Sequence, residues 1–279
     1  HSPSQVWHAL VWYAAAFVLT ACYPNTFVVW QGISLRLGST GSAILPFAAT
    51  AAVFLAAVIS ILRRPISPRD KPFYSNRRGW TYIVAGAAIA LVGILATDPN
   101  FPAKRIHIPQ YFILAFVVRR ALSFDLPARW LFPGAVLLTT VLGVHDELIQ
   151  GLLPTRTFGL RDIGVNFLGA LSGGAVGAGL SLFSTPENKN APIPDKRTLF
   201  GIVAVGLGLA LMIAPLEYFR DVSIPVWTVL PLLAAGFALC LLGWRDTFSR
   251  TRPFTFFILI TMTLPLYLLL SHAHTINFH

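Results

Sequence analysis

The chain has 279 residues, of which 55% are hydrophobic and only 11% are charged, and its mean hydropathy is +0.68. A soluble domain carries about 25% charged residues, so this composition excludes an ordinary water-soluble protein and predicts an integral membrane protein. The net charge of +10 does not indicate nucleic-acid binding, because the 21 Lys and Arg residues are scattered between apolar runs. We therefore expect no nucleic-acid partner.

Apolar windows that are long enough to cross a bilayer recur along the whole chain. A hydrocarbon core of about 30 Å needs roughly 20 apolar residues in a helix. In chain order the windows are Val6–Ala21, Ser42–Leu62, Trp80–Ala96, His107–Phe124, Ala128–Gln150, Asp162–Phe183, Leu199–Leu216, Pro225–Trp244 and Phe254–Leu270. The segment Tyr23–Gly41 either extends the first helix or forms a short interfacial segment. We predict an all-α, polytopic membrane bundle with about nine transmembrane helices.

The distribution of Lys and Arg predicts the orientation of the bundle. Cytoplasmic loops carry an excess of these residues. The loops after the second, fourth, sixth and eighth windows hold 15 of the 21, and the opposite loops hold 6. We therefore expect the N-terminus inside and the C-terminus outside. We divide the chain into a two-helix segment with a basic loop (1–79), a four-helix core (80–183) and a three-helix segment (184–279).

The hairpin between the fifth and sixth windows concentrates polar residues at the predicted outer face. Ionisable residues at such a depth are costly and therefore indicate functional sites. Glu147 and Gln150 are three residues apart, and Asp162 and Asn166 are four apart, so each pair shares a helix face. The hairpin also contains Asp146, Arg156 and Arg161. Because unpaired charge in a low dielectric is expensive, we expect the two arginines to neutralise the carboxylates.

A second polar group begins the fourth window, where His107, Gln110 and Tyr111 share one helix face at its outer end. Both groups lie at the same predicted depth, which indicates a recessed, outward-facing polar pocket. The candidate ligand-binding residues are His107, Gln110, Tyr111, Asp146, Glu147, Gln150, Arg156, Arg161, Asp162 and Asn166.

Gly169, Gly173 and Gly177 form a doubled G-x-x-x-G pattern in the sixth window. Small residues at this spacing favour close helix packing in membranes. We interpret them as packing residues that help to fix the geometry of the polar end of this helix.

The sequence favours neither a metal site nor a cofactor. His107 and His145 are the candidate metal ligands, together with the carboxylates of Glu147 and Asp162. Neither H-E-x-x-H nor a comparably specific spacing is present. We therefore predict no metal and no cofactor.

The polar residues resemble those of the VanZ-like membrane protein family. The resemblance depends on H-x-x-Q-Y-F-x-L at 107–114, D-E-x-x-Q at 146–150, Arg156, and D-x-x-x-N-x-x-G at 162–169, and it covers about Trp80–Phe183. The chain departs from the family pattern at Gln110, where Glu is frequent, and at His145, which precedes two acidic residues. The resemblance implies a protein of the bacterial envelope, located in the inner membrane, with a shared site of unassigned chemistry.

Three functions agree with these features. In the first, the pocket binds a lipid-linked or amphipathic ligand whose phosphate or carboxylate is held by Arg156 and Arg161. In the second, the chain is an accessory subunit that contacts other membrane subunits, and its polar residues form a structural clasp. In the third, it is an enzyme with Glu147 or Asp162 as a catalytic acid or base. We prefer the first function, with membrane lipids and a lipid-linked envelope ligand as partners.

Overall fold

The computed structural model describes residues 3–62, 77–98, 101–184, 196–241, 252–274 and 276–279. The described residues form helices and no strand, apart from one isolated bridge between Val222 and Phe278, which confirms the all-α prediction. The helices are α1 (Pro3–Leu62), α2 (Arg77–Ala96), η2 (Pro102–Ile106), α3 (His107–Leu122), α4 (Ala128–Gly151), α5 (Leu160–Gly179), α6 (Lys196–Ile213), η4 (Ala214–Phe219), η5 (Val226–Val229), α7 (Leu230–Leu241), α9 (Arg252–Met262) and α10 (Leu264–Ala273).

Several of these helices are long and apolar enough to cross a membrane. They are Gln5–Thr26, Arg77–Ala96, Ala128–Gly151, Leu199–Phe219 and Phe256–Ala273, and the bent pair Val28–Gly38 and Ala43–Ile59 makes a sixth if it is counted as one span. The described residues thus contain five or six candidate spans, as a multi-pass membrane protein requires. The windows at α3, α5 and α7 are not among them, because α3 and α7 are short and α5 begins with polar residues. The number nine stays a prediction.

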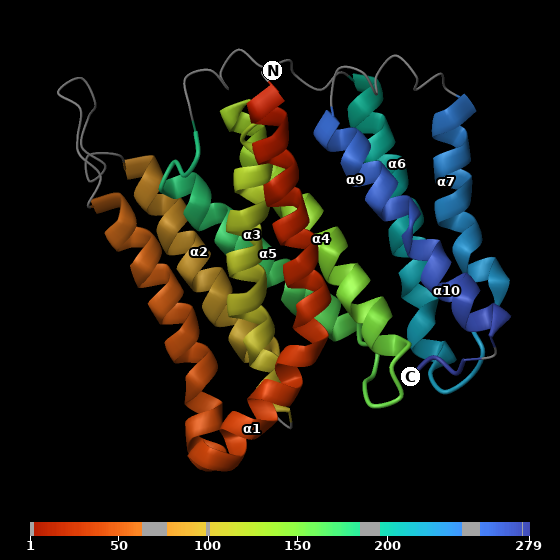
Figure 1. Ribbon diagram of the computed structural model, residues 1–279, viewed down its shortest axis with the longest axis horizontal. Coiled ribbons are helices and arrows are strands. Elements are labelled where there is room, and N and C mark those ends of the chain that lie inside the picture. The colour runs from red at the N-terminus through yellow and green to blue at the C-terminus, as the bar shows by residue number, and fades with distance from the viewer. Residues whose placement is uncertain (1–2, 63–76, 99–100, 185–195, 242–251, 275) are drawn as a thin grey trace.

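The helices run side by side between two ends of the molecule (Figure 1). The N-terminal end of α1 lies at one end of the molecule. The other end holds η2, the loop 152–159 between α4 and α5, η4 and the C-terminus. We call this second end the site end.

α1 continues beyond its first span and then turns. Two of its segments, Val28–Gly38 and Ala43–Ile59, meet at an angle of 115°. Gly38 has a φ of +70°, a left-handed conformation that glycine adopts without steric penalty. Tyr23–Gly41, whose structure the sequence left open, is therefore part of this bent helix. After the bend, the chain runs back toward the opposite end of the molecule.

α5 packs against α2, α3 and α4, and its glycines allow close contact with α3. A Cβ atom added to Gly169 would lie 2.9 Å from Tyr111 Cβ, and one added to Gly177 would lie 3.0 Å from Arg119 Cδ. A Cβ added to Gly173 would collide with the carbonyl oxygen of Phe112. The three glycines therefore face α3, and the separation between the two helices depends on the absence of side chains there.

The apolar core continues from the four-helix core into the C-terminal segment. One cluster of buried residues joins Leu138 and Val141 of α4 to Val205 and Met212 of α6 and to Leu264 of α10. Of the helices that follow residue 184, α9 and α10 contact α4, and α6 and α7 pack against α9. α9 and α10 thus support the helix that supplies Asp146, Glu147 and Gln150.

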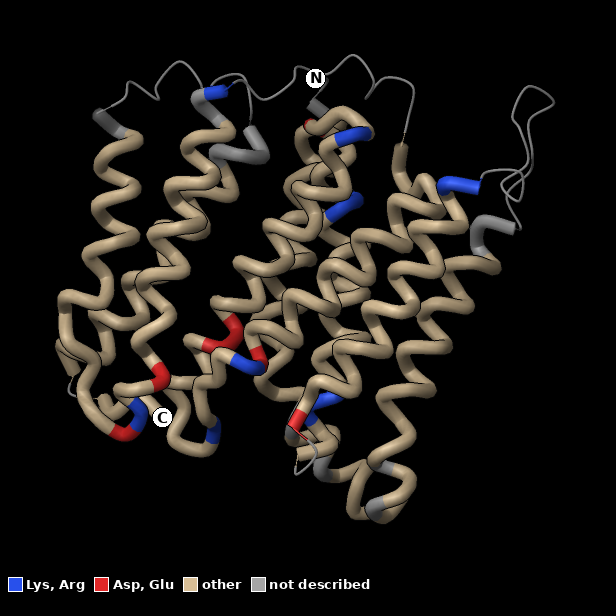
Figure 2. Tube along the Cα trace, turned by 180° about the vertical axis from the view of Figure 1, so that it is seen from behind, with Lys and Arg blue, Asp and Glu red and all other residues tan. Residues whose placement is uncertain are grey.

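Charged residues are unevenly distributed along the bundle (Figure 2). Most of the described acidic residues lie toward the site end, while Lys and Arg occur at both ends. Many of the basic residues that predict the orientation fall within 63–76, 185–195 and 242–251, which lie outside the described residues. The orientation therefore stays a prediction.

Candidate functional site

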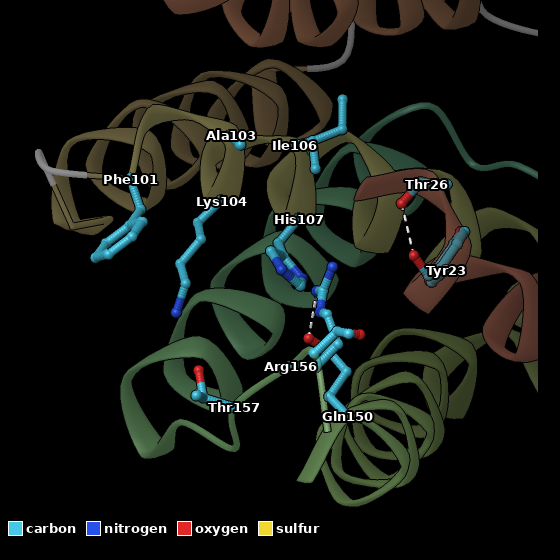
Figure 3. Close-up of a pocket in the computed structure, with 11 residues that line it drawn as sticks. Tyr23, Thr26, Phe101, Ala103, Lys104, Ile106, His107, Gln150, Arg156 and Thr157 are labelled. Atoms are coloured by element: carbon cyan, nitrogen blue, oxygen red, sulfur yellow. Dashed lines mark hydrogen bonds between the residues drawn. The ribbon is translucent and has the colours of Figure 1, made fainter. Parts of the chain in front are cut away.

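A cavity of about 280 Å³ opens at the site end, next to the ends of two candidate spans (Figure 3). Four parts of the chain form its wall: the end of the first span in α1, the segment from η2 to the start of α3, the last turn of α4, and the loop 152–159. The lining residues are Tyr23, Thr26, Phe101, Ala103, Lys104, Ile106, His107, Gln150, Thr155, Arg156 and Thr157.

Local structure places the lining side chains. Pro102 begins η2, where its fixed φ suits the first turn and its missing N–H costs nothing. α3 follows η2 directly at His107, so this imidazole reaches the cavity from the first turn of the helix (Figure 3). On the opposite wall, Arg156 donates from Nη2 to Oε1 of Gln150. The arginine is thereby held between the α4–α5 loop and the last turn of α4.

The C-terminal tail fixes the same loop. The backbone N–H of Phe158 donates to the carbonyl oxygen of His279 at 2.7 Å, and the N–H of His279 donates to the carbonyl of Gly151 at 2.9 Å. Phe278 is fully buried between these two contacts and packs against the Phe158 ring. The loop that carries Arg156 is therefore anchored at both of its ends.

Lys104 and Asp162 form an ion pair with Nζ and Oδ2 2.5 Å apart. The pair connects η2 to the first turn of α5, and the Asp162 side chain is 6% exposed. The sequence predicted that Arg156 and Arg161 would neutralise the carboxylates of the hairpin. For Asp162, Lys104 performs this role, although it was not among the predicted site residues.

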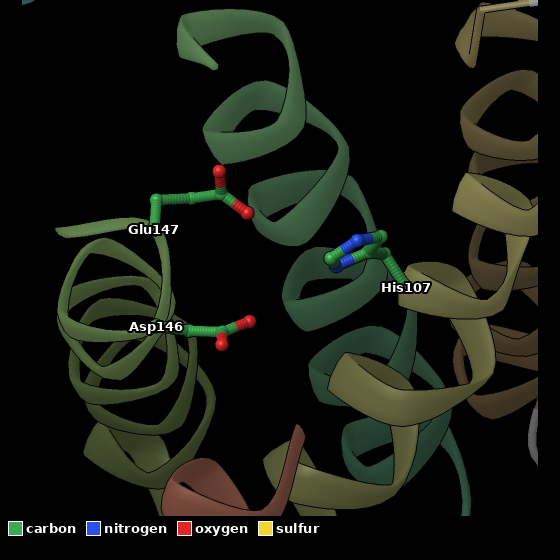
Figure 4. A group of neighbouring side chains, drawn as sticks. All are labelled: His107, Asp146 and Glu147. Atoms are coloured by element: carbon green, nitrogen blue, oxygen red, sulfur yellow. The ribbon is translucent and has the colours of Figure 1, made fainter. Parts of the chain in front are cut away.

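Behind the cavity wall, His107, Asp146 and Glu147 form a buried cluster (Figure 4). One possible ligand atom from each residue lies within 4.8 Å of the other two. Tyr111 Oη donates to Asp146 Oδ2 at 2.8 Å, and the backbone N–H of Gly159 donates to Glu147 Oε2 at 3.3 Å. Hydrogen bonds from α3 and from the loop thus orient both carboxylates.

Several buried polar atoms of this region have no hydrogen-bond partner among the described residues. They are His107 Nδ1, Asp146 Oδ1 and both amide atoms of Asn166. Asn166 lies where α5 crosses α4, close to Gly143 and to the Tyr111 ring. Buried polar atoms are normally paired, so this group of unpartnered atoms indicates a place where a ligand, an ion or water completes the structure.

Arg156 is the charged group best placed to receive an anion. It lies outside the candidate spans and lines the cavity. Burial lowers the pKa of its guanidinium, and the nearby carboxylates of Asp146, Glu147 and Asp162 act in the opposite direction. Because an arginine side chain stays protonated in proteins, its partial burial leaves a poorly solvated cation facing the cavity.

The structure brings most of the predicted residues together, in two layers. His107, Gln150 and Arg156 line the cavity, and Tyr111, Asp146 and Glu147 lie behind it.

Three predicted residues point elsewhere. Gln110 Nε2 donates to Thr26 Oγ1 at 2.6 Å, so its amide faces α1. Arg161 Nε donates to the carbonyl of Ala96 at the end of α2. His145 faces α9 and α10, where its ring nitrogens lie 3.0 Å from the Ile260 carbonyl and 3.2 Å from Tyr267 Oη, so it is directed away from His107.

The contribution of α1 to the site was missed. Tyr23 and Thr26 line the cavity, and the Tyr23 hydroxyl donates to the carbonyl of Gln110 at 2.8 Å. The sequence did contain an indication of this contribution, because two polar side chains, Tyr23 and Thr26, follow the first apolar window. Helical spacing relates residues within one helix, so it gave no reason to place α1 beside α3.

Comparison of the chain with family models, with curated proteins and with solved structures gives no match. The resemblance to the VanZ-like family thus depends on the motif residues in Trp80–Phe183 alone.

Proposed function

We propose that this chain is a multi-pass protein of the bacterial inner membrane with a VanZ-like core. In this proposal, its cavity opens at the outer face of the membrane and binds the anionic headgroup of a lipid-linked or amphipathic ligand. The N-terminus is inside, as the loop charges predict, so the site end lies outside.

The observation that carries the proposal is the mixed lining of one cavity. Arg156 and Lys104 supply positive charge from opposite walls, while Phe101 and Ile106 supply apolar surface from the same segment as Lys104 (Figure 3). A ligand with a charged head and an apolar body matches both parts of this lining. The position next to the ends of two candidate spans suits a ligand that stays in the membrane.

The two cations of the cavity wall differ in their partners. Lys104 is paired with Asp162, whereas Arg156 donates to Gln150 and lies near the carboxylates of Asp146, Glu147 and Asp162. A guanidinium binds phosphate or carboxylate through two parallel hydrogen bonds, and charge-assisted bonds of this kind contribute about 1.5–3 kcal/mol each. We expect Arg156 to hold the headgroup, because it lines the cavity and its guanidinium offers two parallel donors.

Decyl phosphate, a single-chain anionic amphiphile, tests the proposal. The protein is purified in dodecyl maltoside, and bound decyl phosphate is counted by native mass spectrometry, with decanol as the uncharged probe. We expect the wild type to bind decyl phosphate in preference to decanol, and Arg156→Gln to bind it about tenfold more weakly or worse.

Arg161→Gln is the matched control, because Arg161 lies in the same hairpin but its side chain bonds to Ala96 outside the cavity. This variant should bind as the wild type does. If the two variants bind alike, or if decanol binds as well as decyl phosphate, the proposal is wrong.

A structural role is the second candidate, because several polar groups of the site satisfy one another. The Lys104–Asp162 and Tyr111–Asp146 contacts connect η2 to α5 and α3 to α4, as a clasp in an accessory subunit would. If the cluster is only a clasp, Asp162→Asn should lower thermal stability in detergent and leave decyl phosphate binding intact in the folded fraction. Weakened decyl phosphate binding in the folded fraction of this variant would instead favour the pocket.

A further inference from the structure

We propose that His107, Asp146 and Glu147 bind one divalent transition-metal ion behind the cavity wall. An imidazole nitrogen and two carboxylate oxygens are a donor set that suits Zn²⁺. The sequence did not favour this site, because the ligands come from two helices and match no local motif. The packing of the first turn of α3 against the end of α4 brings them together (Figure 4).

The separations of the donor atoms are close to those that zinc requires. Zinc binds nitrogen and oxygen at about 2.0–2.2 Å, which places neighbouring tetrahedral ligand atoms about 3.4 Å apart. The three donor atoms of the cluster lie within 4.8 Å of one another. Binding of one ion therefore requires the donor atoms to approach one another by at most about 1.4 Å.

The donor atoms are also available. His107 is 6% exposed and Asp146 is fully buried, yet His107 Nδ1 and Asp146 Oδ1 have no hydrogen-bond partner among the described residues. Figure 4 shows the imidazole of His107 directed toward the two carboxylates. Burial removes water from these two atoms without giving them another partner, which costs free energy. Coordination of a metal ion would offset that cost.

Asp146 Oδ2 and both oxygens of Glu147 already accept a hydrogen bond from the protein, so the Glu147 oxygen that ligates the metal would use its second lone pair. Tyr111 donates to Asp146 Oδ2, and Glu147 accepts from the Gly159 N–H and from Gln150 Nε2 at 3.2 Å. Metal sites characteristically orient their ligating carboxylates through such outer hydrogen bonds. The cluster therefore already contains the supporting groups that a metal site needs.

The charge balance supports a cation. Asp146 and Glu147 are neighbours on one helix and both are fully buried, so their charges repel each other in a low dielectric. Arg156 lies near both carboxylates and offsets part of their charge, whereas Lys104 is paired with Asp162. A divalent cation offsets both charges at once.

Zinc binding by the protein alone tests this inference, without any amphiphile, so its outcome is separate from that of the proposed function. The full chain in detergent is treated with EDTA, desalted and titrated with ZnCl₂ by calorimetry. We expect one Zn²⁺ per chain, and about tenfold or greater weakening in His107→Gln, Asp146→Asn and Glu147→Gln.

Glu217→Gln and His279→Gln are the controls, since both residues lie at the site end but outside the cluster. They should bind zinc as the wild type does. Equal binding by the wild type and by the triple variant of the cluster would overturn the inference, because the zinc would then be held at other sites.

A measurement on the wild type covers the case in which the variants do not fold. X-ray absorption at the zinc edge should show only nitrogen and oxygen neighbours at about 2.0–2.2 Å and the outer-shell signal of a single imidazole. A sulfur neighbour or two imidazoles would overturn the inference. Such a result would assign the ion to a cysteine or to the C-terminal histidines.

Discussion

Lys104 and Asp162 are separated by 58 residues, yet Lys104 Nζ lies 2.5 Å from Asp162 Oδ2. This ion pair connects the short helix before α3 to the first turn of α5. It therefore links η2, which lies at the opening of the cavity, to α5. Gly169, Gly173 and Gly177 of α5 are the glycines that face α3.

Removing one charge of this pair should destabilise the protein. Loss of one partner from a buried ion pair costs about 3–5 kcal/mol, because the remaining charge stays buried without compensation. The Lys104 side chain is 29% exposed, so we expect a smaller loss, about 1–3 kcal/mol, for Asp162→Asn. Thermal unfolding in detergent measures the change.

The double variant Lys104→Gln/Asp162→Asn should lose less than the sum of the two single variants, since neither charge then remains alone. Glu217→Gln breaks an ion pair with Arg220 in which both side chains are about 40% exposed. It should change stability by less than about 1 kcal/mol. Equal losses in Asp162→Asn and Glu217→Gln would contradict a special role for the buried pair.

The close approach of α3 and α5 predicts a second effect. Gly173→Ala places a Cβ atom against the backbone carbonyl of Phe112, which no side-chain rotation can relieve. We expect a loss of about 1–3 kcal/mol in thermal unfolding, as for other overpacked sites.

Gly164 lies on the same helix, and a Cβ added there meets no atom within 4 Å. Gly164→Ala should therefore leave stability unchanged or raise it by about 0.5–1 kcal/mol, because alanine is the better helix former. If both alanine variants behave alike, the glycines do not set the distance between the helices.

The C-terminal tail should be required for an ordered α4–α5 loop. Phe278 is fully buried, and its ring lies against Phe158 and Gly151. Phe278→Ala should cost about 3–5 kcal/mol, as expected for truncation of a buried aromatic side chain. It should also speed amide hydrogen exchange in residues 155–158, next to Arg156.

Ile276→Ala is the control, because Ile276 is 38% exposed and lies two residues from Phe278. Its exchange pattern should match that of the wild type. Unchanged exchange of the loop in Phe278→Ala would show that the tail does not anchor it.

The sequence predicted well those features that depend on residues close in the chain. Apolar windows located the helices, and the beginning of α3 at His107 agrees with the predicted window. The break between α9 and α10 was not predicted, because both halves are apolar. Pro265 lies in the first turn of α10, and the carbonyl of Ile260 accepts from Thr263 and lies 3.0 Å from His145 Nε2 instead of continuing the helix.

The site was predictable only in part, for a similar reason. Helical spacing placed Glu147 with Gln150, and the structure gives a hydrogen bond between them at 3.2 Å. The pairing of Lys104 with Asp162 and the contribution of Tyr23 depend on which helices are neighbours. Periodicity within a helix does not contain that information. His145 was named as a candidate metal ligand together with His107, but its ring faces Tyr267 and the Ile260 carbonyl instead.

The predicted orientation can be tested with two single cysteines. Arg77 begins α2 at the end opposite to the site, and Thr157 lies in the α4–α5 loop at the site end, and both are exposed. In a chain whose Cys22 and Cys240 are replaced by Ser, Thr157→Cys should react with a membrane-impermeant maleimide on intact spheroplasts. Arg77→Cys should react only after the membrane is opened, because a basic helix end is expected on the cytoplasmic side.

Labelling of Arg77→Cys alone would invert the orientation and place the cavity on the inner face. If both positions are labelled from the same side, the chain crosses the membrane an even number of times between them. The prediction that they lie on opposite sides would then be wrong.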